Sequence, residues 1–299
     1  MTAIDVDGFS WAKGHGTEND FVLLPDPDGR VHGAFADERA ERFVAALCDR
    51  RRGLGADGVI RIVRAGVLAD QFGDEHARRA FDDGAEWFMD YRNADGSLSQ
   101  MCGNGVRVFA RWLLEEGHVS GLAPLPLGTR AGTVSATLDP DELVSVDMGP
   151  VRRTHDSEIT IGERRWQAIG VDVGNPHAVV AVGDVGDAGA LIEPPGHDSA
   201  TYPHGVNVEF VAGVGERHVR MRVHERGSGE TRSCGTGACA AAVLAEQLAG
   251  HPARPATYLV DVAGGRLAVT LRDDGHAVLT GPAEVVARGT LTWSGSITS

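Results

Sequence analysis

Two stretches of this chain resemble each other. Residues 88–117 read FMDYRNADGSLSQMCGNGVRVFARWLLEEG, and residues 221–250 read MRVHERGSGETRSCGTGACAAAVLAEQLAG. Each copy has the pattern of a strand, a Gly-containing loop, Cys-Gly-x-Gly, a helix and a terminal Gly. The cysteine and the terminal Gly are 15 residues apart in the first copy and 16 in the second. An internal repeat of this kind predicts two similar domains that face each other across a pseudo-twofold axis.

The rest of the pattern predicts few helices and many short strands. Asp37 can cap a helix over 38–50, and the helix after Cys102 ends near Gly117. Residues 238–248 are apolar nearly all round, which predicts a helix buried on every side. The charged segment 64–86 is expected to be a surface excursion. Candidate strands, separated by Gly, Asp and Pro turns, are 59–63, 87–91, 144–148, 179–182, 206–211, 219–223 and 267–271.

Composition narrows the class of protein. The 299 residues carry 28 Lys and Arg against 42 Asp and Glu, a formal charge of −14. Nucleic acids and anionic membranes attract clustered basic residues, so neither is the expected partner. The start of the chain has no signal-peptide pattern, and the longest uncharged stretch is too short to span a bilayer. The four cysteines form no C-x-x-C pair, which argues against zinc and disulfide scaffolds and favours a reducing, cytoplasmic setting.

The two Cys-Gly-x-Gly motifs are the strongest functional signal. At the start of a helix the first backbone N–H groups have no intrahelical partner and lie at the positive end of the helix dipole. A thiol there is acidified, and a carboxylate can accept the same N–H groups. We therefore interpret Cys102 and Cys234 as activated thiols on either side of one anion-binding cleft. Cys48 and Cys239 are interpreted as small buried hydrophobic residues.

Two opposed thiols suit one reaction in particular. Inversion of a carbon next to a carboxylate needs a base on one face and an acid on the other. One thiolate removes the α-proton and the opposite thiol returns a proton, while the helix N-termini stabilise the developing negative charge. This scheme needs no metal and no cofactor. A disulfide between Cys102 and Cys234 would silence such a site and is read as an oxidation hazard.

Other motifs remain ambiguous on spacing alone. Residues 53–58 match G-x-G-x-x-G, but a helix is expected before them and a strand after them, the reverse of a dinucleotide-binding unit. The residue pair Glu225-Arg226 can be an exposed charge pair or part of a site, and His177 can be a satisfied loop histidine. Four asparagines beside turn residues can each be a turn former or a ligand: Asn19, Asn93, Asn175 and Asn207.

At this point the sequence resembles a known family, the cofactor-independent diaminopimelate epimerases. The matching stretches occur in order from about residue 11 to residue 291: Lys13-Gly14-His15-Gly16 with Asn19-Asp20-Phe21, Tyr91 to Ser97, Met101 to Gly105, Gly174 to His177, Gly205-Val206-Asn207, Glu225 to Thr231 and Ser233 to Gly237. The two Cys motifs alone would also fit relatives of the proline racemase type.

The resemblance implies a fold and a division of the chain. The fold is α/β (of the α+β type), with two pseudo-symmetric domains, each a barrel-like, mostly antiparallel sheet around a central helix, and an active site in the cleft between them. The first domain covers 1–148 and is completed by the C-terminal strand in 285–299; the second covers 149–284. Such enzymes are usually homodimers.

The resemblance also implies residue roles. Cys102 and Cys234 are the catalytic acid/base pair, and His177 and Glu225 tune the thiols. The residues implied to bind the small-molecule substrate are Gly103, Asn104, Gly235 and Thr236 at the reacting carboxylate, Glu225 at an ammonium, and Asn19, Asn93, Asn175, Asn207 and Arg226 at the remaining polar groups, chiefly the distal carboxylate. The chain departs from the family at Glu18, where relatives often have Gly, and at Gly58, where some have a substrate-contacting Gln.

The expected activity is the interconversion of LL- and meso-2,6-diaminopimelate, in lysine and peptidoglycan-precursor biosynthesis. The alternative is a racemase or epimerase of the same fold that acts on another amino acid. Arg226, Glu225 and the four asparagines favour a substrate with a second charged end, which proline lacks. A thiol–disulfide oxidoreductase would need a C-x-x-C pair, and a non-enzymatic binding protein would not need both Cys-Gly-x-Gly motifs.

Overall fold

The structure is a computed structural model that describes residues 8–120, 123–139 and 143–292. The chain divides into two compact units. The first unit contains the residues up to Gly16, Asp20–Val144 and the residues from Ala283 onward; the second contains Thr17–Asn19 and Ser145–Pro282. The sequence placed the boundaries after residues 148 and 284, and the division into independent domains at those positions stays a prediction.

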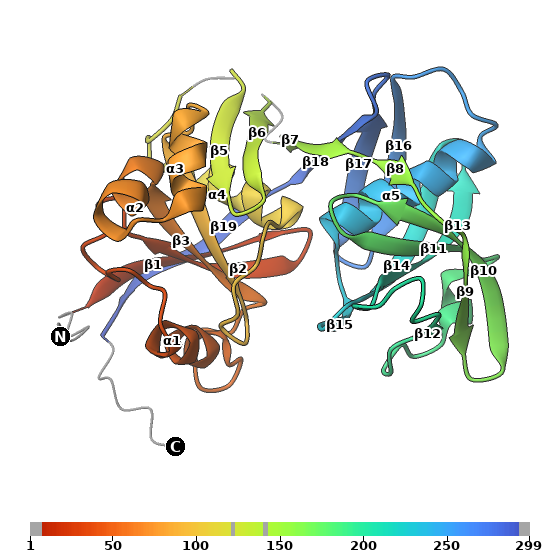
Figure 1. Cartoon of the computed structure of the whole chain (residues 1–299), viewed down its shortest axis with the longest axis horizontal. Coiled ribbons are helices and arrows are strands. Elements are labelled where there is room, and N and C mark those ends of the chain that lie inside the picture. Colours follow the sequence, from red (N-terminus) through yellow and green to blue (C-terminus); the bar gives the residue numbers. More distant parts are fainter. Residues whose placement is uncertain (1–7, 121–122, 140–142, 293–299) are drawn as a thin grey trace. The chain divides into compact units, whose positions relative to one another are not determined.

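The first unit combines strands with four helices along the described chain (Figure 1). Its elements are β1 (Phe9–Gly16), β2 (Asn19–Pro25), α1 (Glu38–Cys48), β3 (Gly58–Arg64), α2 (Ala65–Phe72), α3 (Glu75–Asp82), β4 (Trp87–Asn93), α4 (Gly103–Glu115), β5 (Leu125–Thr129), β6 (Gly132–Leu138), the start of β7 (Leu143–Pro150) and β19 (Glu284–Leu291).

The second unit contains more strands and a single α-helix within the described residues. Its elements are the rest of β7, β8 (Arg152–Arg153), β9 (Ser157–Ile161), β10 (Arg164–Asp172), β11 (Pro176–Ala181), the 3₁₀ turn η1 (Val185–Ala188), β12 (Gly196–His197), β13 (Asn207–Gly215), β14 (His218–Glu225), β15 (Gly229–Thr231), α5 (Gly235–Leu248), β16 (Ala256–Val262), β17 (Gly265–Leu271) and β18 (His276–Pro282).

The strand pairing follows the sequence repeat. In the first unit β2 is parallel to β3, β3 antiparallel to β4, β4 parallel to β5 and β5 antiparallel to β6. In the second unit β11, β13, β14, β16 and β17 are paired in the same parallel and antiparallel sequence. The helix follows the third strand in both, as α4 after β4 and α5 after β14. The predicted α/β class with two similar halves is confirmed.

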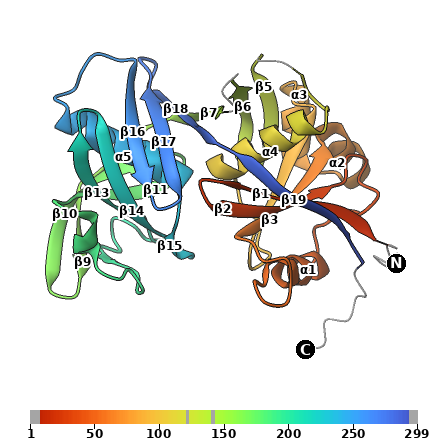
Figure 2. The ribbon, with the colours of Figure 1, turned by 180° about the vertical axis from the view of Figure 1, so that it is seen from behind.

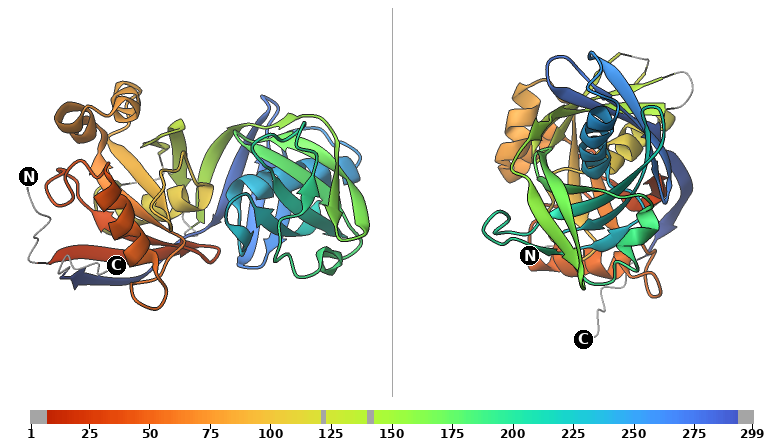
Figure 3. Two further views of the ribbon diagram at one scale, coloured as in Figure 1. Left: turned by 60° about the horizontal axis from the view of Figure 1, so that its bottom comes forward. Right: turned by 90° about the vertical axis from the view of Figure 1, so that its right-hand side faces the viewer.

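Each half has one helix against the concave side of its strands. Helix α5 packs against β10, β11, β13, β14, β16, β17 and β18, and in the end-on view it lies inside the ring of strands (Figure 3). It is rich in alanine, and Ala238 to Ala242 are buried together with Cys239. Small side chains on every face let strands approach a helix from all sides. Helix α4 packs against β1, β3, β6 and β19 and is buried from Gly103 to Leu113.

The last strand returns to the first unit. Strand β19 runs antiparallel beside β1, with Leu291 opposite Phe9 and Glu284 opposite His15, and Figure 2 shows the blue strand along the red one. The chain therefore passes from the first unit to the second through β7 and returns after β18, so the first unit is built from both ends of the described chain.

No helix was predicted for residues 64–86, the segment expected to be a surface excursion. This segment forms two helices, α2 and α3, and Asp74 caps the second by accepting from the backbone N–H of Ala77. Small apolar residues on one side of these helices are buried: Ala65, Leu68, Ala69, Ala77 and Ala80. The many charged residues between them obscured this narrow apolar face in the sequence. The predicted core positions of Cys48 and Cys239 are confirmed, and burial raises the pKa of Cys48 to about 12.

Candidate active site

Cys234 is the N-cap residue of α5, in the second unit. Its backbone is extended, and its Sγ accepts a hydrogen bond from the backbone N–H of Gly237 at 3.3 Å. The same Sγ lies 3.5 Å from Oγ1 of Thr236. The sulfur thus occupies the place where a Ser or Asp side chain caps a helix, which brings it to the positive end of the helix dipole. The cysteine is buried, with 6% of its surface exposed.

The surroundings of Cys234 favour the protonated thiol. Burial raises the pKa of Cys234 well above its ordinary value, and the nearby carboxylates of Glu225 and Glu209 raise it further. The contacts with Thr236 and with the Gly237 N–H act in the opposite direction and are smaller. Burial also raises the pKa of Glu225, whose carboxylate accepts hydrogen bonds from Thr231 and from the Cys234 thiol. Burial and the two nearby carboxylates thus both favour the protonated form of the Cys234 thiol.

His177 belongs to a chain of polar contacts that leads to α5. It is fully buried on β11, with Nδ1 2.7 Å from Oε1 of Glu209 and Nε2 2.9 Å from Oδ1 of Asn175. Nδ2 of Asn175 donates to Oγ1 of Thr236 at 3.5 Å. These contacts connect Glu209, His177 and Asn175 to the hydroxyl of Thr236, which lies beside Cys234. Four of the predicted site residues (Asn175, His177, Cys234 and Thr236) are thereby brought together.

Asn207 and Arg226 are also joined. Oδ1 of Asn207 accepts from the backbone N–H of Arg226 at 2.9 Å, and its Nδ2 donates to the carbonyl of Pro176 at 3.3 Å. The Arg226 guanidinium donates to the carbonyl of His204 at 3.2 Å. Gly205 has φ +80°, and a Cβ there would lie 3.1 Å from Cδ of Arg226. Glycine at this position therefore leaves room for the arginine stem.

The first unit repeats the helix start with different details. Cys102 is the N-cap of α4 and also has extended backbone, but its surface is partly exposed where that of Cys234 is buried. The glycines Gly103 and Gly105 flank the fully buried Asn104 in the first turn. A Cβ on Gly105 would lie 3.2 Å from Cδ1 of Ile60 and 3.5 Å from the Cys102 Cβ, so the helix start packs closely on β3.

Asn93 and Gly58 are neighbours at the ends of paired strands in the first unit. The two residues are opposite each other in the antiparallel pair β3–β4. Nδ2 of Asn93 donates to Oγ of Ser97 at 3.0 Å and so stabilises the turn that follows β4. A Cβ on Gly58 would lie 2.6 Å from the ring of Tyr91 and 2.5 Å from the Arg92 carbonyl. A larger residue such as Gln would fit at position 58 only if the β4 backbone moved.

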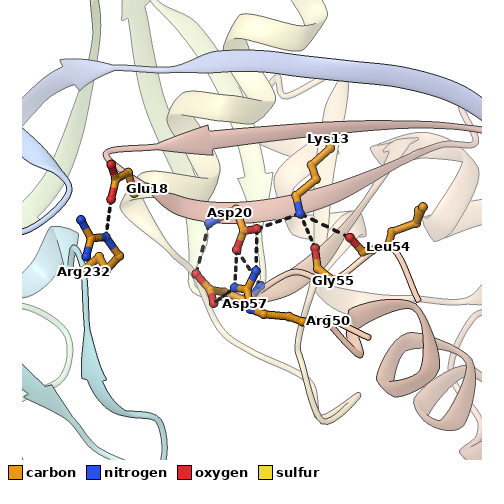
Figure 4. Close-up of polar contacts among 8 residues, drawn as sticks. All are labelled: Lys13, Glu18, Asp20, Arg50, Leu54, Gly55, Asp57 and Arg232. Atoms are coloured by element: carbon orange, nitrogen blue, oxygen red, sulfur yellow. Dashed lines mark hydrogen bonds and ion pairs between the residues drawn. The ribbon is translucent and has the colours of Figure 1, made fainter. Parts of the chain in front are cut away.

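The turn that contains Glu18 and Asn19 groups with the second unit. Thr17 and Glu18 both have positive φ (52° and 62°), the conformation that glycine adopts without strain, which explains why Gly suits the Glu18 position. Glu18 forms an ion pair with Arg232 (Figure 4). Oγ1 of Thr17 lies 2.6 Å from Oγ of Ser233, the residue before Cys234. Asn19 therefore adjoins the segment that leads into α5, through its neighbours in the chain.

Lys13 and Asp20 of the matching stretch form a structural cluster in the first unit (Figure 4). Asp20 pairs with Lys13 at 3.0 Å and with Arg50 at 2.8 Å, and Arg50 also pairs with Asp57 at 2.7 Å. Burial acts to raise the pKa of Asp20, but hydrogen bonds from Arg50 and Lys13 outweigh it and lower the pKa to about 2. The cluster ties β1 and β2 to the loop before β3.

Glu209 is the residue that sequence reasoning missed. It is fully buried on β13. Its Oε1 contacts His177 and it shares its strand with Asn207, so it adjoins two residues predicted for the site. A signal was available. Residues two apart on a strand point to the same face, so a site role for Asn207 predicts that Glu209 faces the same region.

Comparison with known proteins identifies the family. The family model described as diaminopimelate epimerase matches residues 11–154 and 169–286. A diaminopimelate epimerase of Streptomyces coelicolor is 51% identical over 286 residues, covering 94% of this chain and 94% of that protein. One of Thermobifida fusca is 47% identical over 279 residues, covering 93% and 96%. The chain belongs to the diaminopimelate epimerase family. The resemblance seen in the sequence is thereby confirmed.

Solved structures support the fold. A hydroxyproline epimerase of Agrobacterium vitis, solved with bound trans-4-hydroxy-L-proline, superposes with a TM-score of 0.65 at 17% identity, covering 95% of this chain and 92% of that one. This likeness concerns the fold alone. Across the described residues of this diaminopimelate epimerase family member, no helix is long and apolar enough to cross a bilayer.

Proposed function

We propose that this chain is an isomerase that interconverts LL- and meso-2,6-diaminopimelate by moving one α-proton between the thiols of Cys102 and Cys234. Membership of the diaminopimelate epimerase family carries the proposal. The two matched helix starts support the choice of residues, because each places a cysteine at the N-cap of a buried helix. Neither cysteine is part of a disulfide, and acid/base chemistry requires the sulfur in that state.

The proton transfer has two halves. A thiolate takes the α-proton from one face of the substrate, so that its S–H bond forms as the C–H bond breaks and the electron pair stays on the carbon and its carboxylate. The opposite thiol then gives its proton to the other face and becomes the thiolate. The mechanism requires both sulfurs to approach one α-carbon from opposite sides. The reverse reaction exchanges the two roles.

The surroundings of the two cysteines suggest which one starts as the acid. Burial, Glu225 and Glu209 all favour the protonated form of Cys234. Cys102 is the more exposed of the two. We therefore assign Cys234 as the thiol of the resting enzyme and Cys102 as the base that meets the α-proton first.

The remaining polar residues would bind the substrate. The backbone N–H groups of Gly103, Asn104, Gly235 and Thr236 lie in the first turns of α4 and α5, where such groups stabilise a carboxylate as its charge grows. Arg226 offers a planar fork that matches the distal carboxylate, and Glu225 offers an acceptor for an ammonium. The proposed distal contacts are completed by Asn19, Asn93, Asn175 and Asn207.

The test is a cofactor-free assay of the purified chain on LL-diaminopimelate in deuterium oxide. Chiral chromatography should show approach to an equilibrium of LL and meso forms, and mass spectrometry should show one deuterium at each α-carbon that has been inverted. Lysine and proline serve as controls and should not be inverted at a comparable rate. Faster turnover of proline or lysine would favour the alternative of a racemase for another amino acid. Activity that disappears with a chelator and returns with a metal ion would contradict the two-thiol mechanism.

We also propose that the enzyme works as a homodimer in the cytoplasm. The net charge of −14, the lack of a disulfide among the four cysteines and the family resemblance support this setting. Size-exclusion chromatography with light scattering would give the mass in solution. A monomeric mass at assay concentration would contradict the dimer.

A further inference from the structure

Glu209 is a carboxylate in an unusual position. None of its surface is exposed, its Oε1 lies 2.7 Å from Nδ1 of His177, and its Oε2 has no hydrogen-bond partner among the described residues. A buried carboxylate is costly unless nearby groups compensate its charge. The identity of those groups indicates what this side chain does.

The carboxylate lies against the start of α5. A Cβ on Gly237 would be 2.8 Å from Oε1 of Glu209 and 3.3 Å from Sγ of Cys234. One glycine thus makes room for both the carboxylate and the sulfur. The N-terminal end of α5 carries a partial positive charge, which favours an anion at this place.

The ring of His177 supplies the second compensation. Both of its nitrogens face oxygens, Nδ1 that of Glu209 and Nε2 that of Asn175. A carboxylate can only accept, so Nδ1 of His177 is the donor toward Glu209. The buried carboxylate thus fixes the orientation of the His177 ring, whose other nitrogen contacts Asn175 and, through it, the hydroxyl of Thr236.

We propose that Glu209 is a positioning residue of the epimerase site: it holds the His177 ring through Nδ1 and places its negative charge beside the Cys234 sulfur, across Gly237. The proposal rests on the proposed function of Cys234. Glu209 itself neither touches the reacting carbon nor exchanges a proton with it. Its effect passes through His177, Asn175 and Thr236 to the sulfur, and through space across the first turn of α5.

Charged and titratable groups from each neighbouring element face this region. They are His177 on β11, Glu209 on β13, Glu225 at the end of β14, Cys234 at the start of α5, and the Tyr202 hydroxyl in the loop before β13. Glu209 acts in the same direction on three of them, since it raises the pKa of Cys234, of Glu225 and of Tyr202. Removing its charge should therefore make the Cys234 thiolate easier to form.

The test compares Glu209→Gln with Glu209→Asp. Glutamine keeps the shape but removes the charge. We expect kcat to fall at least about tenfold with KM changed less than about threefold, and the basic limb of the pH–rate profile to move to lower pH by about half a unit or more. Aspartate keeps the charge on a shorter side chain. Glu209→Asp should therefore keep the basic limb of the pH–rate profile near its wild-type position. Its kcat should fall in part, because the shorter side chain misplaces His177.

Glu246→Gln is the matched control. Glu246 is a mostly buried carboxylate near the other end of α5 and pairs with Arg254 at 2.7 Å. Its removal should lower the melting temperature without moving the basic limb. If Glu209→Gln behaves like Glu246→Gln, Glu209 has only a structural role and the inference is wrong.

A measurement that does not depend on turnover separates this inference from the proposed function. The ¹⁵N shift of His177 Nδ1 should differ, at the same pH, between the wild-type protein and Glu209→Gln, because the amide oxygen of glutamine is a weaker acceptor than a carboxylate. Unchanged ring shifts would overturn the inference even in an active enzyme. Changed ring shifts in a chain that does not invert diaminopimelate would instead refute the proposed function and leave the pairing of Glu209 with His177 standing.

Discussion

The starts of α4 and α5 are two versions of one motif, and they differ in what surrounds the sulfur. Cys234 is buried beside the hydroxyl of Thr236 and near two carboxylates, whereas Cys102 is partly exposed and is followed by the buried amide of Asn104. The strands that precede them differ too: β14 ends in Glu225 and β4 in Asn93. The helix start is thus repeated, while the carboxylates of Glu225 and Glu209 lie near the thiol of the second unit. Two equivalent folds can in this way hold two inequivalent thiols.

The first prediction removes each thiol in turn. Cys102→Ala and Cys234→Ala should each lower kcat about 10³-fold or more, because a general acid or base contributes on that scale and neither thiol can replace the other. The measurement is the chiral assay, with circular dichroism to show that both variants fold. Near-normal turnover by either variant would refute the two-base scheme. Cys239→Ala, which removes a thiol from the buried part of α5, is the control and should remain active.

The second prediction concerns Arg226, the residue directly after β14. Arg226→Lys keeps the positive charge but loses the fork that fits a carboxylate. A charge-assisted contact contributes roughly 1.5–3 kcal/mol, so kcat/KM for diaminopimelate should fall about ten- to 150-fold. Discrimination against lysine, which lacks the distal carboxylate, should fall as well. An unchanged kcat/KM would mean that Arg226 is not the clamp and that the asparagines alone select the substrate.

The third prediction uses the glycines at the third helical residue of the two motifs. A Cβ on Gly237 meets Glu209 and Cys234, while a Cβ on Gly105 meets the flexible tip of Ile60. Gly237→Ala should therefore lower kcat at least about tenfold by displacing the sulfur and the carboxylate. Gly105→Ala should lower it less, by about threefold or under, because a side-chain tip can yield. The assay measures both, and equal losses would show that the two helix starts are equally crowded.

The parts of the fold that follow the internal repeat could be predicted from the sequence. The two cysteine motifs predicted two similar halves, each with a helix after its cysteine, because matched spacing is visible in a single chain. The helices in segment 64–86 were not predicted because α2 and α3 bury mainly alanines between charged residues. Glu209 was missed because the family motif ends at Asn207, and only the two-residue spacing along the strand places Glu209 on the same face. The contacts of His177 needed the parallel register of β11 with β13, in which His177 is opposite Asn207.

The contact partners of individual site residues could also be assigned only from the structure. Asn207 was predicted to bind substrate, and both ends of its amide are engaged with backbone in this structure. Glu225 and Arg226 are adjacent in sequence but face different partners, the Cys234 thiol for one and the His204 carbonyl for the other. A single sequence gives residue types at a spacing and cannot assign such partners. The substrate roles of these residues stay predictions.

The last prediction concerns a buried histidine of the first unit and its effect on stability at low pH. His32 in the first unit is buried among Phe9, Phe35 and Phe43, and neither ring nitrogen has a hydrogen-bond partner among the described residues. Burial lowers the pKa of His32 to about 4, and the positive charge of Arg61 acts in the same direction, while the carboxylates of two nearby aspartates oppose it.

A histidine with a lowered pKa in the folded state is protonated first in the unfolded state. Stability is therefore complete above the unfolded pKa of about 6.5 and decreases as the pH falls toward 4, by a total of about 3 kcal/mol. Urea unfolding of the wild-type chain between pH 7.5 and 4.5 should show this decrease, and His32→Phe should remove most of it without changing kcat at pH 7.5. Phe35→Leu is the control, because it disturbs the same aromatic cluster but keeps the titrating ring. It should lower stability at every pH and retain the slope, and a slope unchanged in His32→Phe would assign the acid sensitivity to other groups.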